Sequence, residues 1–420
     1  MRTLADWLER QERTHPSAID LTLDRVREVA RRLDLLTPAH RVITVAGTNG
    51  KGSTVAYLDA VLRAHGLRTG RFTSPHLARY NERIVVDGVE AADAALIESF
   101  ERIDAARGDI TLTFFEYNAL AALDHFRREQ VGAAVLEVGL GGRLDATNII
   151  DADVGIVCSI GLDHVDWLGN TVEDIGREKA GIFRGGRPAV LGSANLPRSV
   201  FEVIQAVGAR PVIFGRDFSA LIYPDPAQPR WNFRCGDVEL RGLPFPGLSG
   251  SLQIVNAATA LAALVVGDIG ITLEATRAGE ALAAVRLPGR FQVVPGDVEW
   301  IFDVAHNVPA AAVLSANLKK RPPRRTLAVC GILADKDVAG IAATLAADVD
   351  TWIPVTLAGP RALPPAEFRR RLPPQARIDG HSGDVASACR RARELANPGD
   401  RVVVFGSFLT VGPALEFLGI

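Results

Sequence analysis

The chain has 420 residues, of which 48% are hydrophobic and 23% are charged, and its formal net charge is −2. This is the composition of an ordinary globular protein, so the disordered and fibrous classes are excluded. A nucleic-acid binder would carry a basic surplus, which is absent here, so we expect no nucleic acid as a partner. Single domains usually hold roughly 100–200 residues, and a chain of this length therefore predicts two or three of them.

The cysteines and the N-terminus indicate a compartment. The four cysteines, Cys158, Cys235, Cys330 and Cys389, lie far apart and form no CxxC pair. This spacing predicts reduced, mostly buried thiols in a reducing compartment. Residues 1–10 are charged and lack the apolar stretch of a secretory signal, and no segment approaches the roughly 20 apolar residues of a membrane helix. We therefore expect a cytoplasmic protein with no membrane partner.

The first half of the chain alternates between helix and strand patterns. Apolar residues at helical spacing predict helix within residues 3–33, the β-branched run 41–46 predicts a buried strand, and a helix is expected over residues 55–65. Because strands separated by helices imply a parallel sheet covered on both faces, ligand chemistry belongs at the carboxyl ends of the strands. Further helices are expected over residues 115–129 and 171–180, and further strands over 133–138, 154–159 and 188–191.

The second half begins with a change of pattern. Residues 216–250 combine prolines with short alternating runs, which predict a small antiparallel excursion, and a helix resumes over residues 253–264. The punctuation in Leu287-Pro-Gly-Arg290 predicts a boundary between a larger domain, 1–288, and a smaller α/β domain, 289–420. In the smaller domain the strands are expected over residues 300–304, 326–331, 350–355 and 401–405.

A glycine-rich loop, Gly47-Thr-Asn-Gly-Lys-Gly-Ser-Thr54, follows the first buried strand and precedes a helix. In this context backbone N–H groups and the helix N-terminus attract phosphate oxygens, Lys51 would reach the β- and γ-phosphates, and a hydroxyl of Ser53 or Thr54 would bind phosphate or metal. The spacing departs from GxxxxGK[ST], so a plain glycine-rich turn is the alternative. The nearest match to a guanine-selecting motif, Ala334-Asp-Lys-Asp337, lacks the leading Asn or Thr, which favours ATP over GTP.

Three titratable residues in the larger domain stand near predicted strand ends. Glu137 closes a strand where a carboxylate would hold a phosphate-bridging magnesium ion, although a buried, paired glutamate is the alternative. His164 follows the next strand beside acidic neighbours, which shifts a usually structural residue towards a ligand. Lys179, taken by itself, has the pattern of an ordinary surface lysine.

The smaller domain repeats this arrangement. Asp303 and His306 follow its first strand, and Gly406-Ser407 follows its last one. Since the carboxyl ends of parallel strands share one edge, each of these residues is expected to face a cleft.

Together these motifs resemble the folylpolyglutamate synthases and dihydrofolate synthases of the Mur ligase superfamily. The murein-precursor ligases of that superfamily usually carry Gly-Lys-Thr-Thr, so Gly52 favours the folate branch. Two positions depart from the family pattern, Val304 in place of glycine and Leu409 in place of an aromatic residue. The matching segments run in order along most of the chain: 47–53, 73–77, 113–116, 137–142, 144–148, 163–169, 178–182, 256–257, 289–290, 303–307, 335–337 and 406–407.

The resemblance implies an α/β fold of the Mur ligase type. A P-loop-containing, parallel-sheet ATP-binding domain with the folate site would occupy residues 1–288. A smaller C-terminal, Rossmann-like α/β domain on the glutamate side would occupy residues 289–420.

The resemblance also implies roles for individual residues. Magnesium, with two ions expected, would be held by Ser74, Glu137, His164 and a carbamylated Lys179. ATP would be bound by Asn49, Gly50, Lys51, Gly52, Ser53, Asn256, Arg290 and Asp303. The folate substrate would face Thr113, Phe114, Phe115, Glu116, Leu144, Asp145 and Ala146. The glutamate side would hold His306 and Ser407, and the residues implied in catalysis are Lys51, Lys179, Asp303 and His306.

The implied reaction joins L-glutamate to 7,8-dihydropteroate, giving dihydrofolate, and to tetrahydrofolates, giving polyglutamates, through an acyl phosphate. The implied cofactors are ATP and Mg²⁺, with room for a monovalent cation such as K⁺. The partners are small-molecule substrates, and the family is commonly monomeric, so we expect a monomer. The alternatives are folylpolyglutamate synthase activity only, a murein-precursor ligase, and a P-loop ATPase without ligase activity.

Overall fold

The structure is a computed structural model that describes residues 3–223, 229–359, 361–380 and 383–420. Two compact units make up the chain. The first extends to Gly247 and adds Leu252–Val285, and the second holds Leu248–Ser251 and Arg286–Ile420. The first unit is called unit 1 and the second unit 2.

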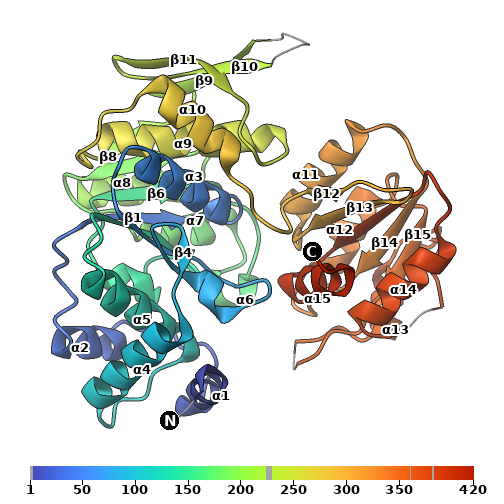
Figure 1. Ribbon diagram of the computed structural model, residues 1–420, viewed down its shortest axis with the longest axis horizontal. Coiled ribbons are helices and arrows are strands. Elements are labelled where there is room, and N and C mark those ends of the chain that lie inside the picture. Colours follow the sequence, from blue (N-terminus) through green and yellow to red (C-terminus); the bar gives the residue numbers. More distant parts are fainter. Residues whose placement is uncertain (1–2, 224–228, 360, 381–382) are drawn as a thin grey trace. The chain divides into compact units, whose positions relative to one another are not determined.

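Unit 1 is built on an eight-stranded sheet in the order β4-β3-β2-β5-β1-β6-β7-β8 (Figure 1). The strands β2, β5, β1, β6, β7 and β8 pair in parallel, as predicted, and only the pairings of β3 with β2 and with β4, at one edge, are antiparallel. Central strands are buried along their whole length, because helices cover a parallel sheet on both faces. The strands are β1 Arg41–Ala46, β2 Thr69–Phe72, β3 Ile84–Val86, β4 Val89–Glu90, β5 Ala133–Glu137, β6 Val154–Val157, β7 Pro188–Leu191 and β8 Arg210–Ile213.

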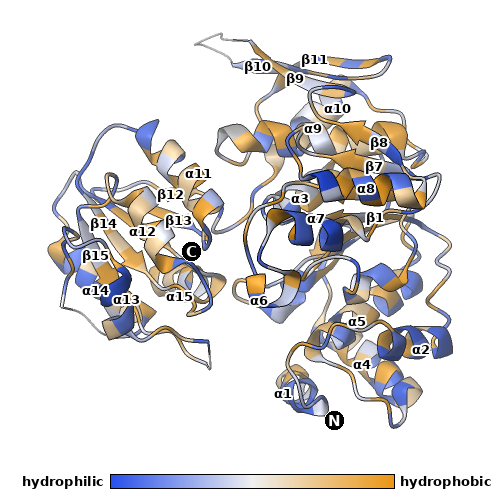
Figure 2. Cartoon of the chain, turned by 180° about the vertical axis from the view of Figure 1, so that it is seen from behind, coloured by the Kyte–Doolittle hydropathy of each residue, from blue (hydrophilic) through white to orange (hydrophobic). Residues whose placement is uncertain are grey.

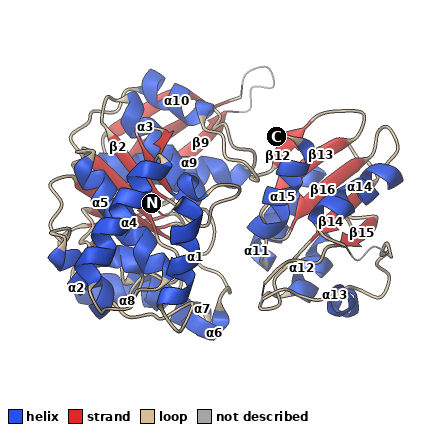
Figure 3. Ribbon diagram, turned by 60° about the horizontal axis from the view of Figure 1, so that its bottom comes forward, coloured by secondary structure: helices blue, strands red, loops and turns tan. Residues whose placement is uncertain are grey.

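Hydrophobic residues are concentrated on these strands, and hydrophilic residues lie on outer helices such as α2 (Figure 2). Figure 3 shows the strands of unit 1 enclosed by helices. None of the helices that the structure describes is long and apolar enough to cross a membrane. The helices are α1 Leu4–Thr14, α2 Asp24–Arg32, α3 Lys51–Ala64, α4 Asp93–Arg107, α5 Phe114–Arg128, α6 Val165–Leu168, α7 Val172–Ala180, α8 Arg198–Val207, α9 Ser251–Val266 and α10 Ala275–Ala284, with short 3-10 helices η1 Tyr80–Arg83 and η2 Ala146–Ile149.

The N-terminal segment differs from the helical pattern expected within residues 3–33. Two helices, α1 and α2, are separated by residues 15–23. α1 ends at Thr14, and the backbone of its C-cap His15 is extended at ψ 141°, because the residue before a proline is driven out of the helical region and Pro16 follows.

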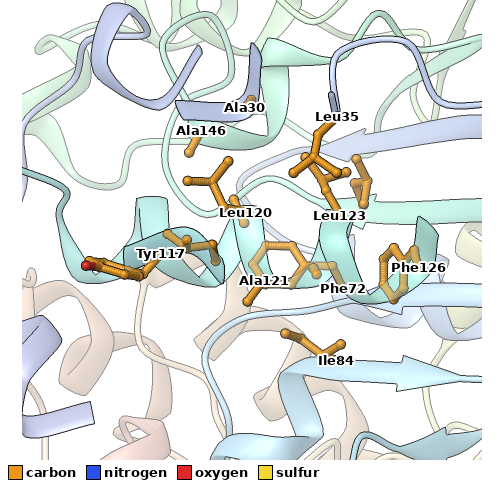
Figure 4. Packing of buried hydrophobic residues seen from close by; sticks show 14 of the residues in the cluster. Ala30, Leu35, Phe72, Ile84, Tyr117, Leu120, Ala121, Leu123, Phe126 and Ala146 are labelled. Atoms are coloured by element: carbon orange, nitrogen blue, oxygen red, sulfur yellow. The ribbon is translucent and has the colours of Figure 1, made fainter. Parts of the chain in front are cut away.

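A hydrophobic cluster of unit 1 joins α5 to the sheet (Figure 4). Phe72 from β2 and Phe126 from α5 are both 0% exposed. Gly70 in β2 lets the Phe126 ring approach the strand, since a Cβ at Gly70 would lie 2.6 Å from two of its ring carbons. The packing of α5 on β2 therefore depends on one missing side chain.

The antiparallel excursion predicted within residues 216–250 is confirmed. It is a three-stranded sheet in the order β11-β10-β9, and residues 224–228 of the expected segment lie outside the described part of the chain. Trp231 and Phe233 of β10 are fully buried. The strands are β9 Phe218–Tyr223, β10 Arg230–Cys235 and β11 Val238–Pro244.

Unit 2 is a smaller α/β unit, as predicted, with a five-stranded sheet in the order β12-β13-β16-β14-β15. All pairings are parallel except that of β12 with β13. The elements are β12 Gln292–Val294, β13 Glu299–Asp303, α11 Val308–Lys319, β14 Thr326–Cys330, α12 Val338–Leu345, β15 Thr351–Pro354, α13 Pro365–Arg371, α14 Val385–Leu395, β16 Arg401–Phe405 and α15 Phe408–Leu418.

Replacing Gly70 with alanine should destabilise unit 1. The new methyl group would overlap the Phe126 ring, and overpacking of this kind typically costs about 1–3 kcal/mol. We expect urea unfolding followed by circular dichroism to show this loss of unfolding free energy. Gly380→Ala is the control, because a Cβ there would meet nothing within 4 Å. Equal stability of the two variants would contradict the packing.

Candidate active site

The carboxyl ends of four neighbouring strands carry most of the residues predicted in unit 1. In the sheet order β2-β5-β1-β6, Val45 of β1 lies opposite Glu137 of β5, and Ala46 lies opposite Val157 of β6. Parallel strands that end level place the loops that follow them at one sheet edge. Four segments therefore start side by side: the phosphate loop after β1, the glycine run after β5, the segment after β6, and the loop with Ser74 after β2.

The phosphate loop is tied to the segment that follows β6. The N–H of Thr48 donates to the carbonyl oxygen of Ser159 at 2.8 Å, and the N–H of Asn49 donates to Ser159 Oγ at 3.0 Å. Gly50 has a φ of +89°, a conformation that favours glycine. α3 begins at Lys51 without a side-chain cap, so the N–H groups of its first turn are available to a phosphate.

Two polar side chains border this loop. Lys51 Nζ donates to the carbonyl oxygen of Gly47 at 2.9 Å, which keeps its charge at the loop. Asn256 approaches from α9, and its Oδ1 lies 2.8 Å from the point where a Cβ at Gly50 would be. The structure therefore brings Asn256 to the predicted nucleotide loop, although about 200 residues separate them in sequence.

The two candidate hydroxyls of the loop differ in their surroundings. Thr54 is 0% exposed, and its Oγ1 accepts a hydrogen bond from Cys158 Sγ at 3.3 Å. Ser53 lies closer to the start of α3. The hydroxyl of Ser53 is therefore the better candidate for a phosphate or metal ligand.

The predicted metal ligands lie around the end of β5. Glu137 is 5% exposed, and its Oε2 accepts the N–H of Ser74 at 3.3 Å. His164 has a φ of +51° at the start of α6, and its N–H donates to Asp163 Oδ1 at 2.9 Å. Ser74, Glu137 and His164 follow β2, β5 and β6 in turn, so all three belong to the same sheet edge.

Magnesium prefers oxygen ligands, and several of them. Within the residues that the structure describes, no group of three or more His, Cys, Asp or Glu side chains is placed to hold a metal ion. Glu137 and His164 form only a pair of such ligands. A carbamate on Lys179 and the hydroxyl of Ser74 would supply further oxygens. The donor set therefore fits magnesium when Lys179 is carbamylated.

Lys179 has the surroundings that carbamylation requires. The surface position that the sequence alone favours is wrong, because Lys179 is 5% exposed on α7. Burial, followed by the charge of Lys51, lowers the pKa of Lys179 to about 7, against opposing effects of Asp163 and Asp145. An amine of this pKa is largely neutral above neutral pH, and the neutral amine is the form that adds to CO₂.

The glycine run after β5 presses against α7. A Cβ at Gly142 would lie 2.8 Å from the carbonyl oxygens of Glu178 and Lys179. The N–H of Arg143 donates to the Glu178 carbonyl oxygen at 2.8 Å, and its guanidinium pairs with the Glu178 carboxylate at 2.8 Å. The run therefore fixes the main chain of the buried lysine.

Asp145 holds this run in shape. Its Oδ2 accepts the N–H groups of Gly139 and Leu140 at 3.0 and 2.9 Å, and its Oδ1 accepts the N–H and hydroxyl of Thr147 at 3.0 and 2.6 Å. Burial raises the pKa of Asp145 despite these bonds. Four donors fill the accepting capacity of a carboxylate, so the side chain of Asp145 organises the loop. Half-buried Leu144 and buried Ala146 flank it.

Thr113 and Glu116 form a capping box at the start of α5. Thr113 Oγ1 accepts the N–H of Glu116 at 3.2 Å, and Glu116 Oε2 accepts the N–H of Thr113 at 2.7 Å. Arg25 Nη2 donates to the other carboxylate oxygen of Glu116 at 3.3 Å. These polar residues fix the helix start, and the half-buried rings of Phe114 and Phe115 are the groups that it presents.

In unit 2, Asp303 ends β13. Its Oδ1 accepts the N–H of Ala305 at 2.8 Å, and its Oδ2 accepts the N–H of Phe291 at 3.0 Å. Burial raises the pKa of Asp303 to about 6, although the charge of Arg290 opposes the shift. The Arg290 guanidinium lies 5.6 Å from the centre of the Phe408 ring.

His306 and Ser407 stand at the same edge of that sheet, because Asp303 lies opposite Phe405 in the parallel pair β13–β16. His306 Nδ1 lies 2.8 Å from the carbonyl oxygen of Val304, so Nδ1 donates a hydrogen bond to that oxygen. Ser407 caps α15, and its Oγ accepts the N–H of Thr410 at 3.1 Å.

Each unit therefore gathers its predicted residues at one sheet edge of its own. Sequence reasoning gave no role to Arg83, His76 or Cys158. Arg83 and His76 are hydrogen-bonded to each other near the Ser74 loop, and Cys158 lies beneath the phosphate loop. Arg83 has the sequence signature of a surface arginine, and only its burial in the fold reveals it.

Known proteins share these features. The family described as 'Mur ligase middle domain' matches residues 45–217. The family described as 'Mur ligase, glutamate ligase domain' matches residues 289–408. The dihydrofolate synthase/folylpolyglutamate synthase of Escherichia coli strain K12 is 45% identical over 99% of this chain and 95% of its own length. The Haemophilus influenzae protein of the same name is 40% identical over 97% of this chain and 96% of its own length.

Solved structures agree with the sequence matches. E. coli FolC in complex with DHPP and ADP has a TM-score of 0.93 and 44% identity, covering 100% of this chain and 98% of that chain. The Yersinia pestis bifunctional folylpolyglutamate synthase/dihydrofolate synthase complexed with AMPPNP and Mn ion has a TM-score of 0.91 and 44% identity, covering 100% and 99%. The chain belongs to the Mur ligase family, among the dihydrofolate synthase/folylpolyglutamate synthases.

Proposed function

We propose that this chain is an ATP- and magnesium-dependent ligase that joins L-glutamate to 7,8-dihydropteroate and to tetrahydrofolates. The observation that carries the proposal is a pair of lysines, Lys51 in the phosphate loop and buried Lys179 on α7, whose pKa the charge of Lys51 helps to lower. The chain also aligns over nearly its whole length with bifunctional relatives.

Unit 1 performs the activation of the acceptor acid. A carboxylate is a poor acyl donor, and transfer of the γ-phosphate of ATP converts it into an acyl phosphate. Such transfer needs positioning and charge neutralisation more than covalent participation by the protein. Lys51 and the N–H groups of α3 bind the phosphates, with Asn49, Gly50, Gly52, Ser53 and Asn256 around them. Ser74, Glu137, His164 and carbamylated Lys179 would hold magnesium, which would supply the remaining positive charge.

The folate acid lies against α5 and the glycine run. Phe114 and Phe115 provide apolar surface at the start of α5. Thr113, Glu116 and Asp145 hold these segments in place through their own hydrogen bonds, and Leu144 and Ala146 border the site.

Unit 2 receives the incoming glutamate. We assign Asp303 and Arg290 to ATP, and His306 and Ser407 to the glutamate. The α-amine attacks the acyl phosphate, and an amide and phosphate are released. We assign the ATP and folate sites to residues 1–288 and the glutamate side to 289–420. We also propose that the enzyme is a monomer in the cytoplasm. Its four cysteines are free and buried, which is consistent with a reducing compartment.

Phosphate release tests the function directly. The enzyme is assayed with ATP, magnesium and glutamate, with dihydropteroate in one reaction and tetrahydrofolate in another. Glutamate-dependent release in both is the expected result. Release with tetrahydrofolate alone would limit the enzyme to polyglutamate synthesis. Release that needs no glutamate would replace the proposal by an ATPase, and no release with either acid would contradict it.

Lys51→Ala should lower kcat by at least about 100-fold, because one preorganised charge at the transferring phosphate is lost. Lys320→Ala is the matched control, since Lys320 is an exposed lysine after α11. Both variants are compared by steady-state kinetics at saturating ATP. Wild-type turnover of Lys51→Ala would remove this lysine from the scheme.

Lys179→Ala should be inactive, and added formate or acetate should restore part of the activity by replacing the carbamate oxygens. An ordinary lysine of pKa 10.5 is neutral in about one molecule in 3,000 at pH 7. With its pKa lowered to about 7, Lys179 is about half neutral there, so carbamate forms above pH 7 and is lost as the pH falls below it.

This chemistry has a readout that needs no turnover. Enzyme equilibrated with ¹³C-bicarbonate should show a carbamate carbon signal in NMR at pH 8 that weakens at pH 6. The signal should be absent from Lys179→Ala and present in Lys320→Ala. A signal that survives in Lys179→Ala, or full activity of that variant without any added carboxylate, would refute the carbamate.

A further inference from the structure

Arg83 stands at the sheet edge that forms the candidate active site. It ends η1, directly before β3, and its carbonyl oxygen accepts the N–H of Thr73 at 3.0 Å. Thr73 follows β2 and precedes Ser74, whose N–H donates to Glu137. Arg83 is therefore fixed beside the end of β2, the strand next to β5, although it belongs to an antiparallel turn.

The side chain of Arg83 is buried between aromatic rings. The residue is 8% exposed, and its guanidinium carbon lies 5.8 Å from the centre of the Tyr80 ring and 5.5 Å from that of Phe114. Its Nε donates to His76 Nδ1 at 2.8 Å. The guanidinium is thus held by the hydrogen bond to His76 and by contacts with the two rings.

The other edge of this guanidinium is open. Across the described residues, neither terminal nitrogen of Arg83 has a hydrogen-bond partner, and no carboxylate oxygen lies within 4.0 Å of them. Both nitrogens nevertheless retain contact with solvent, since neither is among the buried atoms that lack a partner. The fork therefore faces an accessible space.

The nearby carboxylates do not fill this fork. Glu82 accepts the N–H groups of Leu77, Ala78 and Arg79 at 2.7, 2.8 and 2.6 Å. Glu137 accepts the N–H of Ser74 and, in the proposed function, binds magnesium. Taking a charged group out of water is costly unless an opposite charge compensates it. Once a metal occupies Glu137, the buried guanidinium needs an anion from a ligand.

We propose that Arg83 binds the carboxylate of the acceptor acid, the group that receives the phosphate. This inference rests on the proposed function and assigns the anion-binding residue of that site. A planar guanidinium with two open nitrogens matches a carboxylate in a bidentate pair. His76 is a positioning residue, because it acts through its hydrogen bond to Arg83 Nε.

The sheet order identifies which anion Arg83 meets. The phosphate loop follows β1, and β5 lies between β1 and β2. Arg83, at the β2 end, is thus separated from the ATP phosphates by the Glu137 position. It lies instead on the side of Phe114, whose ring it contacts and which the proposed function gives to the folate acid.

The inference is tested by equilibrium binding without ATP, followed by pterin fluorescence. The ligands are dihydropteroate and its methyl ester, which differ only at the carboxylate. Hydrogen bonds to charged groups contribute about 1.5–3 kcal/mol, so wild type should bind the acid about 10- to 100-fold more tightly than the ester. Arg83→Gln should bind both ligands equally, and Arg83→Lys, which keeps the charge without the fork, should retain part of the preference.

Arg79→Gln is the matched control, since Arg79 precedes η1 and its side chain is 67% exposed. It should keep the wild-type preference for the acid. Circular dichroism checks whether each variant is folded. If Arg83→Gln is not folded, the comparison of wild type with Arg83→Lys tests the assignment. An unchanged acid-to-ester ratio in the folded Arg83 variants would overturn the assignment, as would a raised KM for ATP with that ratio intact. Failure of the wild type to release phosphate with either folate acid is a separate result, and it removes the proposed function.

Discussion

The register between β1 and its two neighbours is the constraint on which the site of unit 1 depends. Val45 stands opposite Glu137, and Ala46 stands opposite Val157, so three parallel strands end level. A slip of one residue in either pair would move every side chain of the slipped strand to the opposite face of the sheet. Burial on both faces of the sheet therefore specifies the register. Because the register makes the strands end level, the loops that follow them start at the same edge of the sheet.

Buried and half-buried carboxylates then hold those loops in place. Asp145, Glu116, Glu82 and Asp303 each accept at least one main-chain N–H from their own or an adjoining segment. An N–H group buried without a partner costs free energy comparable to a lost hydrogen bond. These acids therefore stabilise irregular backbone at the sheet edges, where no strand partner is available.

Much of the fold could be predicted from local patterns. The strand over residues 41–46 was predictable because an apolar run rich in β-branched residues favours a strand. The parallel architecture was predictable because such strands alternate with helices. β2 was not predicted, since its four residues include Gly70 and Arg71 and show no apolar run. The break between α1 and α2 was missed as well, although Pro16 is its cause.

The candidate site was predictable to a similar extent. Motifs in family order identified the phosphate loop, Glu137 and Lys179, but sequence alone took Lys179 for a surface residue. Its burial depends on the glycine run that packs on α7, a contact between segments about 35 residues apart. Arg83 was beyond reach for the same reason, because the rings that enclose it come from η1 and α5. Residue type and spacing indicate which chemistry a residue can perform. Its burial depends on contacts between distant segments, which form only in the assembled fold.

Cys158 carries one more consequence. A Cβ at Gly47 or Gly50 would lie 3.1 or 3.4 Å from the Cβ of Cys158, and Cys158 itself packs against Gly192. The floor beneath the phosphate loop thus has room for one small side chain only. During evolution, a bulkier residue at position 158 would require compensating substitutions in the loop above it. Position 158 and the loop positions 47 and 50 should therefore change together and not one at a time.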